Sequence, residues 1–211
     1  MSDLDQRDLG LFPLGMVLLP GERVPLHIFE PRYREMVGEA IRDNSEFGIV
    51  LATEKGVANL GCTARVLEVT KRHPDGRFDI VSMGVRRFEI LLLNEEKEYL
   101  RAAVQFFDDD DAGLAPIAAR EQALAAFCAL KAIEGLDLET PDPETPQLSF
   151  HLAQAVPEIQ FRHLLLGMRS EPARVRHLAE FLPFYAARQQ RVTHIKSVAP
   201  TNGSGQAKLG Q

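Results

Sequence analysis

The length, composition and charge of this chain set the first limits on what it can be. Its 211 residues are 45% hydrophobic, which supplies enough apolar material for one large domain or two small ones. The formal net charge of −6 gives no overall attraction to nucleic-acid phosphates or anionic lipid, so a role in binding nucleic acid would require a local basic patch.

The amino terminus and the cysteines predict the compartment. The opening segment MSDLDQRDLG lacks the basic start and apolar centre of a secretion signal, and we expect residues 1–8 to be disordered. The longest apolar stretch, LFPLGMVLLP, is about half as long as a membrane span and contains two prolines. The cysteines, Cys62 and Cys128, form no CxxC motif and are expected to pack as small apolar side chains. The sequence therefore predicts a cytoplasmic protein with no membrane segment.

Short apolar runs separated by turn residues occupy residues 9–108, which we expect to form the first domain. One helix interrupts them: it begins at Pro31, whose missing N–H is tolerated in a first turn, and it ends near Asn44. Strands are predicted at residues 11–14, 17–19, 24–29, 47–53, 62–70, 77–84, 85–93 and 99–107. Short strands in this number, with one early helix, favour a small, partly closed β-barrel.

The pattern changes after residue 108. Four consecutive carboxylates, Asp108 to Asp111, are followed by small residues. A run of like charges is usually solvated, so we expect residues 109–115 to form a hydrated acidic hinge between two domains.

The remaining sequence has the spacing of helices. We expect a helical subdomain at residues 116–192, followed by a polar, glycine-rich and disordered tail at residues 193–211. Pro183 is expected to end or kink the last helix. A barrel followed by helices places the chain in the α+β class.

The segment at residues 11–37, LFPLGMVLLPGERVPLHIFEPRYREMV, resembles the start of the Lon protease amino-terminal domain, the LON substrate-binding family. The resemblance covers nearly the whole chain, because four further segments follow in the same order and the helical part also matches. These segments are FGIVL (47–51), GCTARVLEV (61–69), PDGRFDIV (74–81) and GVRRFEIL (84–91). The resemblance implies a PUA-like β-barrel with one early helix, followed by a C-terminal helical bundle.

The same resemblance shows what the sequence lacks. Lon joins a domain that selects protein substrates to an AAA+ unfolding module and a Ser–Lys protease dyad. This sequence contains no G-x-x-x-x-G-K-[ST] phosphate-binding loop and no recognisable protease dyad. The resemblance therefore implies a stand-alone, non-catalytic module that recognises unfolded or extended protein segments and would cooperate with a cellular protease in trans.

The segment HIFEPRYR at residues 27–34 has two interpretations. In the first, Phe29 and Tyr33 offer apolar contact to an extended peptide, while His27, Arg32 and Arg34 offer polar contact. In the second, the segment is structural: Glu30 and Pro31 shape the corner between a strand and a helix, and an arginine pairs with a nearby carboxylate.

The alternative function is RNA binding by a PUA-like protein. Its candidate patch is made of four arginines near one predicted hairpin, Arg72, Arg77, Arg86 and Arg87. The patch lacks interleaved aromatic residues on which bases could stack, and the overall charge is negative.

No metal, cofactor or nucleophile is predicted. An EF-hand beginning at Asp108 would place Ala119 at its twelfth position, where a glutamate is required. The six histidines show no HxxxH or HExxH spacing, and no serine lies in a G-x-S-x-G motif. A third hypothesis, a hydrolase, therefore has no residue that we can name for it.

Overall fold

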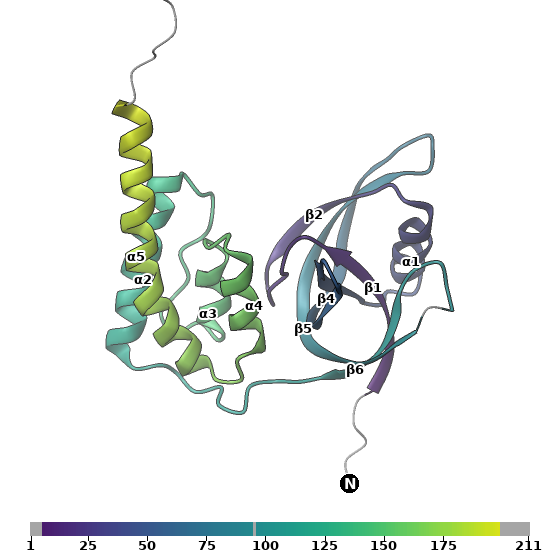
Figure 1. The fold of residues 1–211 in the computed structure, drawn as a ribbon, viewed down its shortest axis with the longest axis horizontal. Helices are drawn as coiled ribbons and strands as arrows, with labels where there is room; N and C mark the ends of the chain where they lie inside the picture. The colour runs from purple at the N-terminus through teal and green to yellow at the C-terminus, as the bar shows by residue number, and fades with distance from the viewer. Residues whose placement is uncertain (1–5, 95, 199–211) are drawn as a thin grey trace, which may run out of the picture.

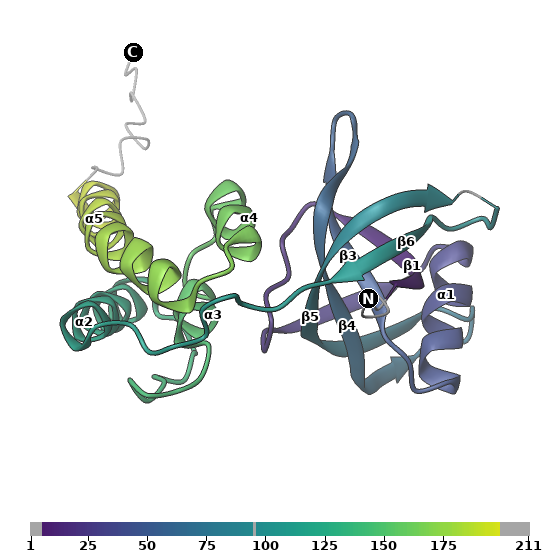
Figure 2. The same cartoon turned by 90° about the horizontal axis from the view of Figure 1, so that it is seen from below.

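The structure is a computed structural model, and it describes residues 6–94 and 96–198. The described chain forms two lobes that lie side by side, a β-barrel from the first half and a group of helices from the second (Figures 1 and 2). One connection runs from the last strand to the first helix of the second lobe (Figure 2). This arrangement confirms the predicted α+β class.

Six strands form one mixed sheet in the order β2-β5-β4-β3-β1-β6, and a further β5–β6 pairing closes most of it into a barrel. The strands are β1 (Gln6–Leu14), β2 (Arg23–Ile28), β3 (Phe47–Thr53), β4 (Gly56–Arg72), β5 (Phe78–Asn94) and β6 (Arg101–Phe106). The long strand β5 serves two neighbours, because its first part pairs with β2 and its last part pairs with β6. The strand β2 is left at an edge.

The amino-terminal boundary was predicted wrongly. The strand β1 begins at Gln6 and pairs antiparallel with β6 over residues 6–10, so residues 6–8 are ordered in the sheet and not disordered. Residues 1–5 lie outside the described part of the chain. Backbone pairing with β6 extends the strand beyond the apolar run that the sequence pattern detected.

The expected strand at residues 17–19 is a buried loop, and the two strands expected at 77–84 and 85–93 are the single strand β5. Gly84 lies where this loop passes close to β5. A Cβ atom at this position would lie 2.1 Å from the backbone oxygen of Leu19, so glycine is required where the loop crosses the strand. In the sequence the same glycine resembles a turn.

The helix α1 (Pro31–Arg42) follows β2 directly and packs on the barrel. It buries Tyr33, Met36, Val37 and Ala40, and the ring of Tyr33 stacks on Phe12 of β1 with 4.2 Å between centroids. The helix ends where predicted, since Asn44 adopts a left-handed conformation with φ of 47°.

The second lobe contains α2 (Ile117–Glu134), α3 (Leu148–Ala153), α4 (Ile159–Gly167) and α5 (Glu171–Val198), of which α2 and α5 pack side by side (Figures 1 and 2). The helix α5 does not end at Pro183, and residues 193–198 of the expected tail are helical. Pro183 cannot donate to the carbonyl of Ala179, but the side-chain amide of Gln122 on α2 donates to that oxygen at 3.0 Å. Residues 199–211 lie outside the described part.

The segment after β6 is exposed at residues 110–114, but the side chain of Asp109, the first residue of the expected hinge, is buried in a junction between the lobes. The side chain of Asp109 is 4% exposed and binds two arginines from different lobes, Arg87 of β5 at 2.7 Å and Arg174 of α5 at 2.5 Å. Arg174 is fully buried and also binds Glu171 and Ser149, each at 2.8 Å. Two positive and two negative charges therefore neutralise one another inside the junction.

A second buried arginine also joins the lobes. Arg162 of α4 donates hydrogen bonds to the carbonyl of Val17 in the barrel loop and pairs with Glu22. It also binds the carbonyls of Ala153 and Val156 within the helical lobe. These contacts fix the loop that precedes β2. Among the helices of residues 6–94 and 96–198, none is long and apolar enough to cross a membrane.

Candidate functional site

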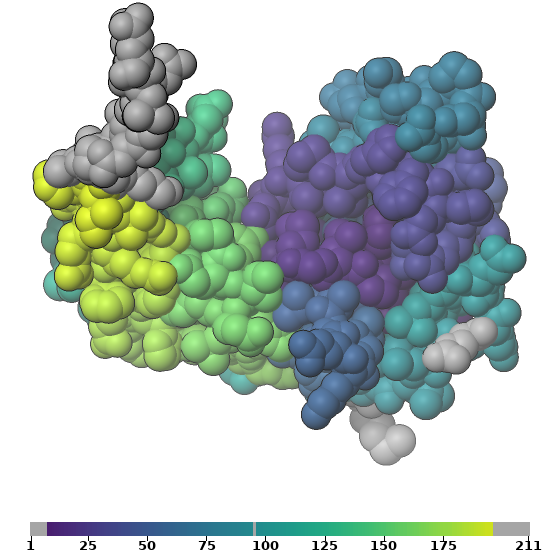
Figure 3. Space-filling view, turned by 45° about the horizontal axis from the view of Figure 1, so that its top comes forward, coloured from purple at the N-terminus to yellow at the C-terminus, as the bar shows by residue number. Residues whose placement is uncertain are grey.

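A groove of about 660 Å³ lies on the barrel between β1, β2 and the start of α1. Its lining is largely apolar and includes Pro13 and Leu14 from β1 and Pro25 and Leu26 from β2. In the space-filling view these amino-terminal segments, coloured purple, form the barrel face beside the helical lobe (Figure 3). The groove is therefore an apolar hollow on an accessible face of the barrel.

Four of the residues proposed to contact a peptide line this groove, but they differ in exposure. Arg34 does not line it and instead donates to the carbonyl of Asp75 at 2.9 Å. The ring of Phe29 is 56% exposed and lies against the ring of His27, with 5.8 Å between centroids. Tyr33 is only 6% exposed, and burial raises the pKa of its hydroxyl. Arg32 lies over the Tyr33 ring at 4.6 Å. Phe29 is thus the aromatic side chain offered to a ligand, whereas Tyr33 forms the wall.

Glu30 and Pro31 form the corner between β2 and α1. Glu30 keeps an extended backbone, and its carbonyl accepts the backbone N–H groups of Tyr33 and Arg34 at 3.0 and 2.9 Å. Its carboxylate pairs with Arg32 at 2.7 Å, and Pro31 occupies the first helical position. The structural interpretation of this motif is therefore compatible with the binding interpretation, because the corner places Phe29 at the groove.

The strand β2 has a free edge. Among the strands that the structure describes, β2 pairs with β5 alone, and its residues Pro25, Leu26 and His27 line the groove. Pro25 is typical of such a strand, because a proline has no N–H to donate to a neighbour. An edge strand beside an apolar groove is the arrangement into which an extended peptide can add as a further strand.

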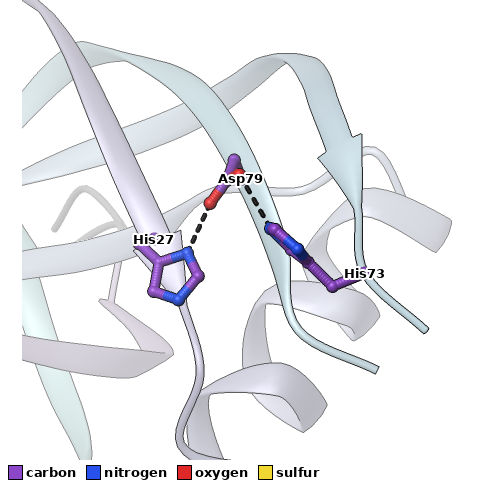
Figure 4. Close-up of side chains that lie close together, drawn as sticks. All are labelled: His27, His73 and Asp79. Carbon is purple, nitrogen blue, oxygen red and sulfur yellow. Dashed lines mark hydrogen bonds and ion pairs between the residues drawn. The ribbon is translucent and has the colours of Figure 1, made fainter. Parts of the chain in front are cut away.

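Three titratable side chains meet beside this groove in a cluster that the sequence did not predict. His27 of β2, His73 of the β4–β5 turn and Asp79 of β5 point toward one another (Figure 4). The carboxylate of Asp79 accepts hydrogen bonds from both rings, and these hold its pKa below the usual value, His27 contributing more than His73. His27 and Asp79 are 52 positions apart, so no local spacing could have shown the cluster.

The four arginines of the RNA alternative do not form a surface patch. Arg87 is buried in the junction, where it binds Asp109 and the carbonyls of Leu166 and Met168. Arg86 lies over the ring of Phe106. Arg72 lies over the ring of Phe78, and Arg77 pairs with the carboxylate of Asp75 at 2.6 Å. The four arginines therefore do not share one basic surface, because Arg87 is buried.

A second hollow of about 530 Å³ has a polar lining and charges that are already paired. Within it, Arg101 binds Asp8 at 2.6 Å, Arg65 binds Glu46 at 2.7 Å, and the hydroxyl of Tyr99 donates to Glu39 at 2.8 Å. A ligand there would have to break these pairs. The apolar groove is the better candidate site.

The cysteines supply no catalytic group to the groove. Cys62 is fully buried in the barrel, and burial raises the pKa of its thiol. Cys128 was expected to pack as a small apolar side chain, but it lies exposed on α2. Neither residue lines the groove.

Comparison with known sequences identifies the family. The family described as the ATP-dependent protease La (LON) substrate-binding domain matches residues 8–199. Lon protease 1 of Hydrogenovibrio crunogenus is 31% identical over 122 residues, which are 52% of this chain and 15% of that protein. Lon protease of Parabacteroides distasonis is 30% identical over 108 residues, covering 47% of this chain and 13% of that protein. The chain thus corresponds to a small part of each protease.

Solved structures give the same result. A crystal structure of a Lon N-terminal domain protein from Xanthomonas campestris aligns with a TM-score of 0.67 and 25% identity, covering 84% of this chain and 99% of that one. The N-terminal domain of a Mycobacterium avium complex Lon protease aligns with a TM-score of 0.58 and 17% identity, which shows a shared fold. Because the family match extends over nearly the whole described sequence, this chain belongs to the LON substrate-binding domain family.

Proposed function

We propose that this chain binds extended or unfolded segments of other proteins in the groove between β1 and β2, and that it does so without catalysis. The observation that carries the proposal is the exposed ring of Phe29 at an apolar groove beside the free edge of β2. Membership of a substrate-binding family supports the same function.

The proposed mechanism combines two contacts that an unfolded segment offers and a folded protein hides. Its backbone pairs with the edge of β2, which gives affinity that does not depend on sequence. Its apolar side chains enter the groove against Phe29, Leu26 and Leu14, which favours segments taken from protein cores. His27 and Arg32 form the polar rim.

The absence of catalysis is part of the proposal. The sequence has no phosphate-binding loop, and the matched family is a substrate-binding domain. A segment held in the groove would therefore be passed to a cellular protease acting in trans. No observation in the structure favours RNA as the ligand.

A matched pair of phenylalanines tests the site. Phe29→Ala removes the ring from the groove, whereas Phe184→Ala removes a ring that is 67% exposed on α5. We expect Phe29→Ala to weaken binding of a reduced and alkylated unfolded protein about tenfold, since truncating an anchor residue typically costs more than about 1 kcal/mol. Fluorescence anisotropy with the labelled unfolded protein measures the affinity.

The control Phe184→Ala should bind as the wild type does, and circular dichroism should show native folding for both variants. Tyr33 is unsuitable for this test because its buried ring packs in the core. If both phenylalanine variants lose the same affinity, or if neither does, the groove is not the binding site.

A further inference from the structure

The cluster of His27, His73 and Asp79 has the composition and convergence of a metal site. One nitrogen from each imidazole and one carboxylate oxygen lie within 4.8 Å of one another. In Figure 4 both rings turn toward the same carboxylate, which lies between them. Among the side chains of residues 6–94 and 96–198, this is the one group of three possible metal ligands that lie so close together.

The backbone holds the three residues in place. His27 of β2 is the direct register partner of Asp79 on β5, so their side chains leave neighbouring strands at the same level. His73 is fixed by the hairpin turn, where its N–H donates to the carbonyl of Arg77 at 2.8 Å and its carbonyl accepts from Gly76 at 3.1 Å. Only side-chain rotations are needed to change how the three groups meet.

The required rotations are small. Nε2 of His73 lies 3.0 Å from the Asp79 carboxylate, and Nδ1 of His27 also contacts that carboxylate. Ligands about 2.1 Å from a tetrahedral zinc ion are about 3.4 Å apart. The three ligand atoms already lie within 4.8 Å of one another, so admitting the ion would change their separations by at most about 1.4 Å.

We propose that His27, His73 and Asp79 bind a divalent transition-metal ion of the zinc class, with three protein ligands and an open coordination position. Imidazole nitrogens select this class over Mg²⁺ and Ca²⁺, which prefer all-oxygen ligands. A bound ion would join the edge strand β2 to the β4–β5 hairpin. The proposal does not depend on peptide binding, although His27 also lines the groove.

The side chains are partly exposed, so an ion could enter and leave from solvent. The exposed fractions are 43% for His27, 20% for His73 and 32% for Asp79. Three ligands and an open position are the arrangement of catalytic zinc sites, whereas structural zinc sites have four protein ligands. We therefore expect reversible binding to a chain that is already folded.

Isothermal titration of the full chain with ZnCl₂ at pH 7.5 tests the site. We expect one ion per chain, and at least a tenfold loss of affinity in His73→Ala and in Asp79→Asn. The matched controls are His177→Ala on α5 and Asp75→Asn in the same hairpin, both at exposed residues outside the cluster. These controls should bind as the wild type does, and MgCl₂ should give no binding.

Nuclear magnetic resonance of the wild-type chain gives a test that needs no variant to fold. Zinc should shift the imidazole resonances of His27 and His73 and leave those of His151 and His177 in place. No binding by the wild type, equal affinity in the cluster variants and the controls, or shifts confined to other histidines would each overturn the proposal.

Discussion

The junction between the lobes and the groove on the barrel are built from the same kinds of residue, but they differ in exposure. At the junction, Arg174 is fully buried, and the side chains of Arg87 and Asp109 are 3% and 4% exposed. At the groove, the side chains of Arg32 and Glu30 are 46% and 37% exposed. The junction arginines are bound on several sides, while the groove arginine has one carboxylate partner and one ring beneath it.

This difference in exposure distinguishes the junction residues, which stabilise the fold, from the groove residues, which are available to a ligand. A buried charge must be paired, because leaving it alone in the interior costs several kcal/mol. The junction network therefore fixes how the lobes meet. An exposed pair contributes little to stability, so the groove residues can exchange their partners for those of a ligand.

We expect the largest loss of stability from a substitution that breaks the junction. Asp109→Ala would leave the buried cations Arg87 and Arg174 without their shared carboxylate, and we expect it to lower the free energy of unfolding by about 3–5 kcal/mol. The matched control is Asp110→Ala, which removes an exposed carboxylate from the same acidic run and should change stability by less than about 0.5 kcal/mol. Urea denaturation followed by circular dichroism measures both. Equal effects would mean that the junction is hydrated after all.

The junction should also make stability depend on acid. Burial alone would raise the pKa of Asp109, but the hydrogen bonds and charges of Arg174 and Arg87 outweigh it and lower this pKa below the unfolded value of about 3.9. A carboxyl whose pKa is lower in the folded state stabilises the protein at any pH above its unfolded-state pKa. This stabilisation is lost as the pH falls through the pKa of the folded state.

We therefore expect the free energy of unfolding to decrease from about pH 5 downward, and to decrease less steeply in Asp109→Asn than in the wild type. Urea titrations at a series of pH values give the two slopes. Parallel curves for the two proteins would show that Asp109 does not carry the acid sensitivity.

We expect the smallest loss of stability from a substitution at the rim of the groove. Arg32→Ala removes an exposed ion pair with Glu30 and a contact over the Tyr33 ring, and we expect it to lower the free energy of unfolding by less than about 1 kcal/mol. A loss as large as that of Asp109→Ala would show that the groove rim is structural. The same urea denaturation measures it.

Local patterns predicted much of the fold. Alternating apolar residues and turn chemistry predicted most of the strands, and Pro31 and Asn44 marked the ends of α1 correctly. The errors came from partners distant in the sequence. Gln122 satisfies the carbonyl that Pro183 leaves free, and Gly84 is needed for contact with a distant loop and does not form a turn. Neither effect is visible in a local window.

The candidate site was predictable only in part. Four residues proposed from the segment HIFEPRYR line one groove because they are neighbours in the chain. The burial of Tyr33 involves packing against Phe12, which the segment does not contain. The meeting of His27 with Asp79 depends on the pairing of β2 with β5, which is a property of the sheet.

Hydrogen–deuterium exchange tests the central claim, that extended protein segments bind along β2, most directly. The wild-type chain is measured alone and with a saturating amount of the reduced and alkylated unfolded protein. If a segment adds to the sheet, backbone amides of β2 (Arg23–Ile28) should exchange more slowly, while amides of α5 (Glu171–Val198) stay unchanged. Protection confined to the helical lobe, with none in β2, would contradict the account.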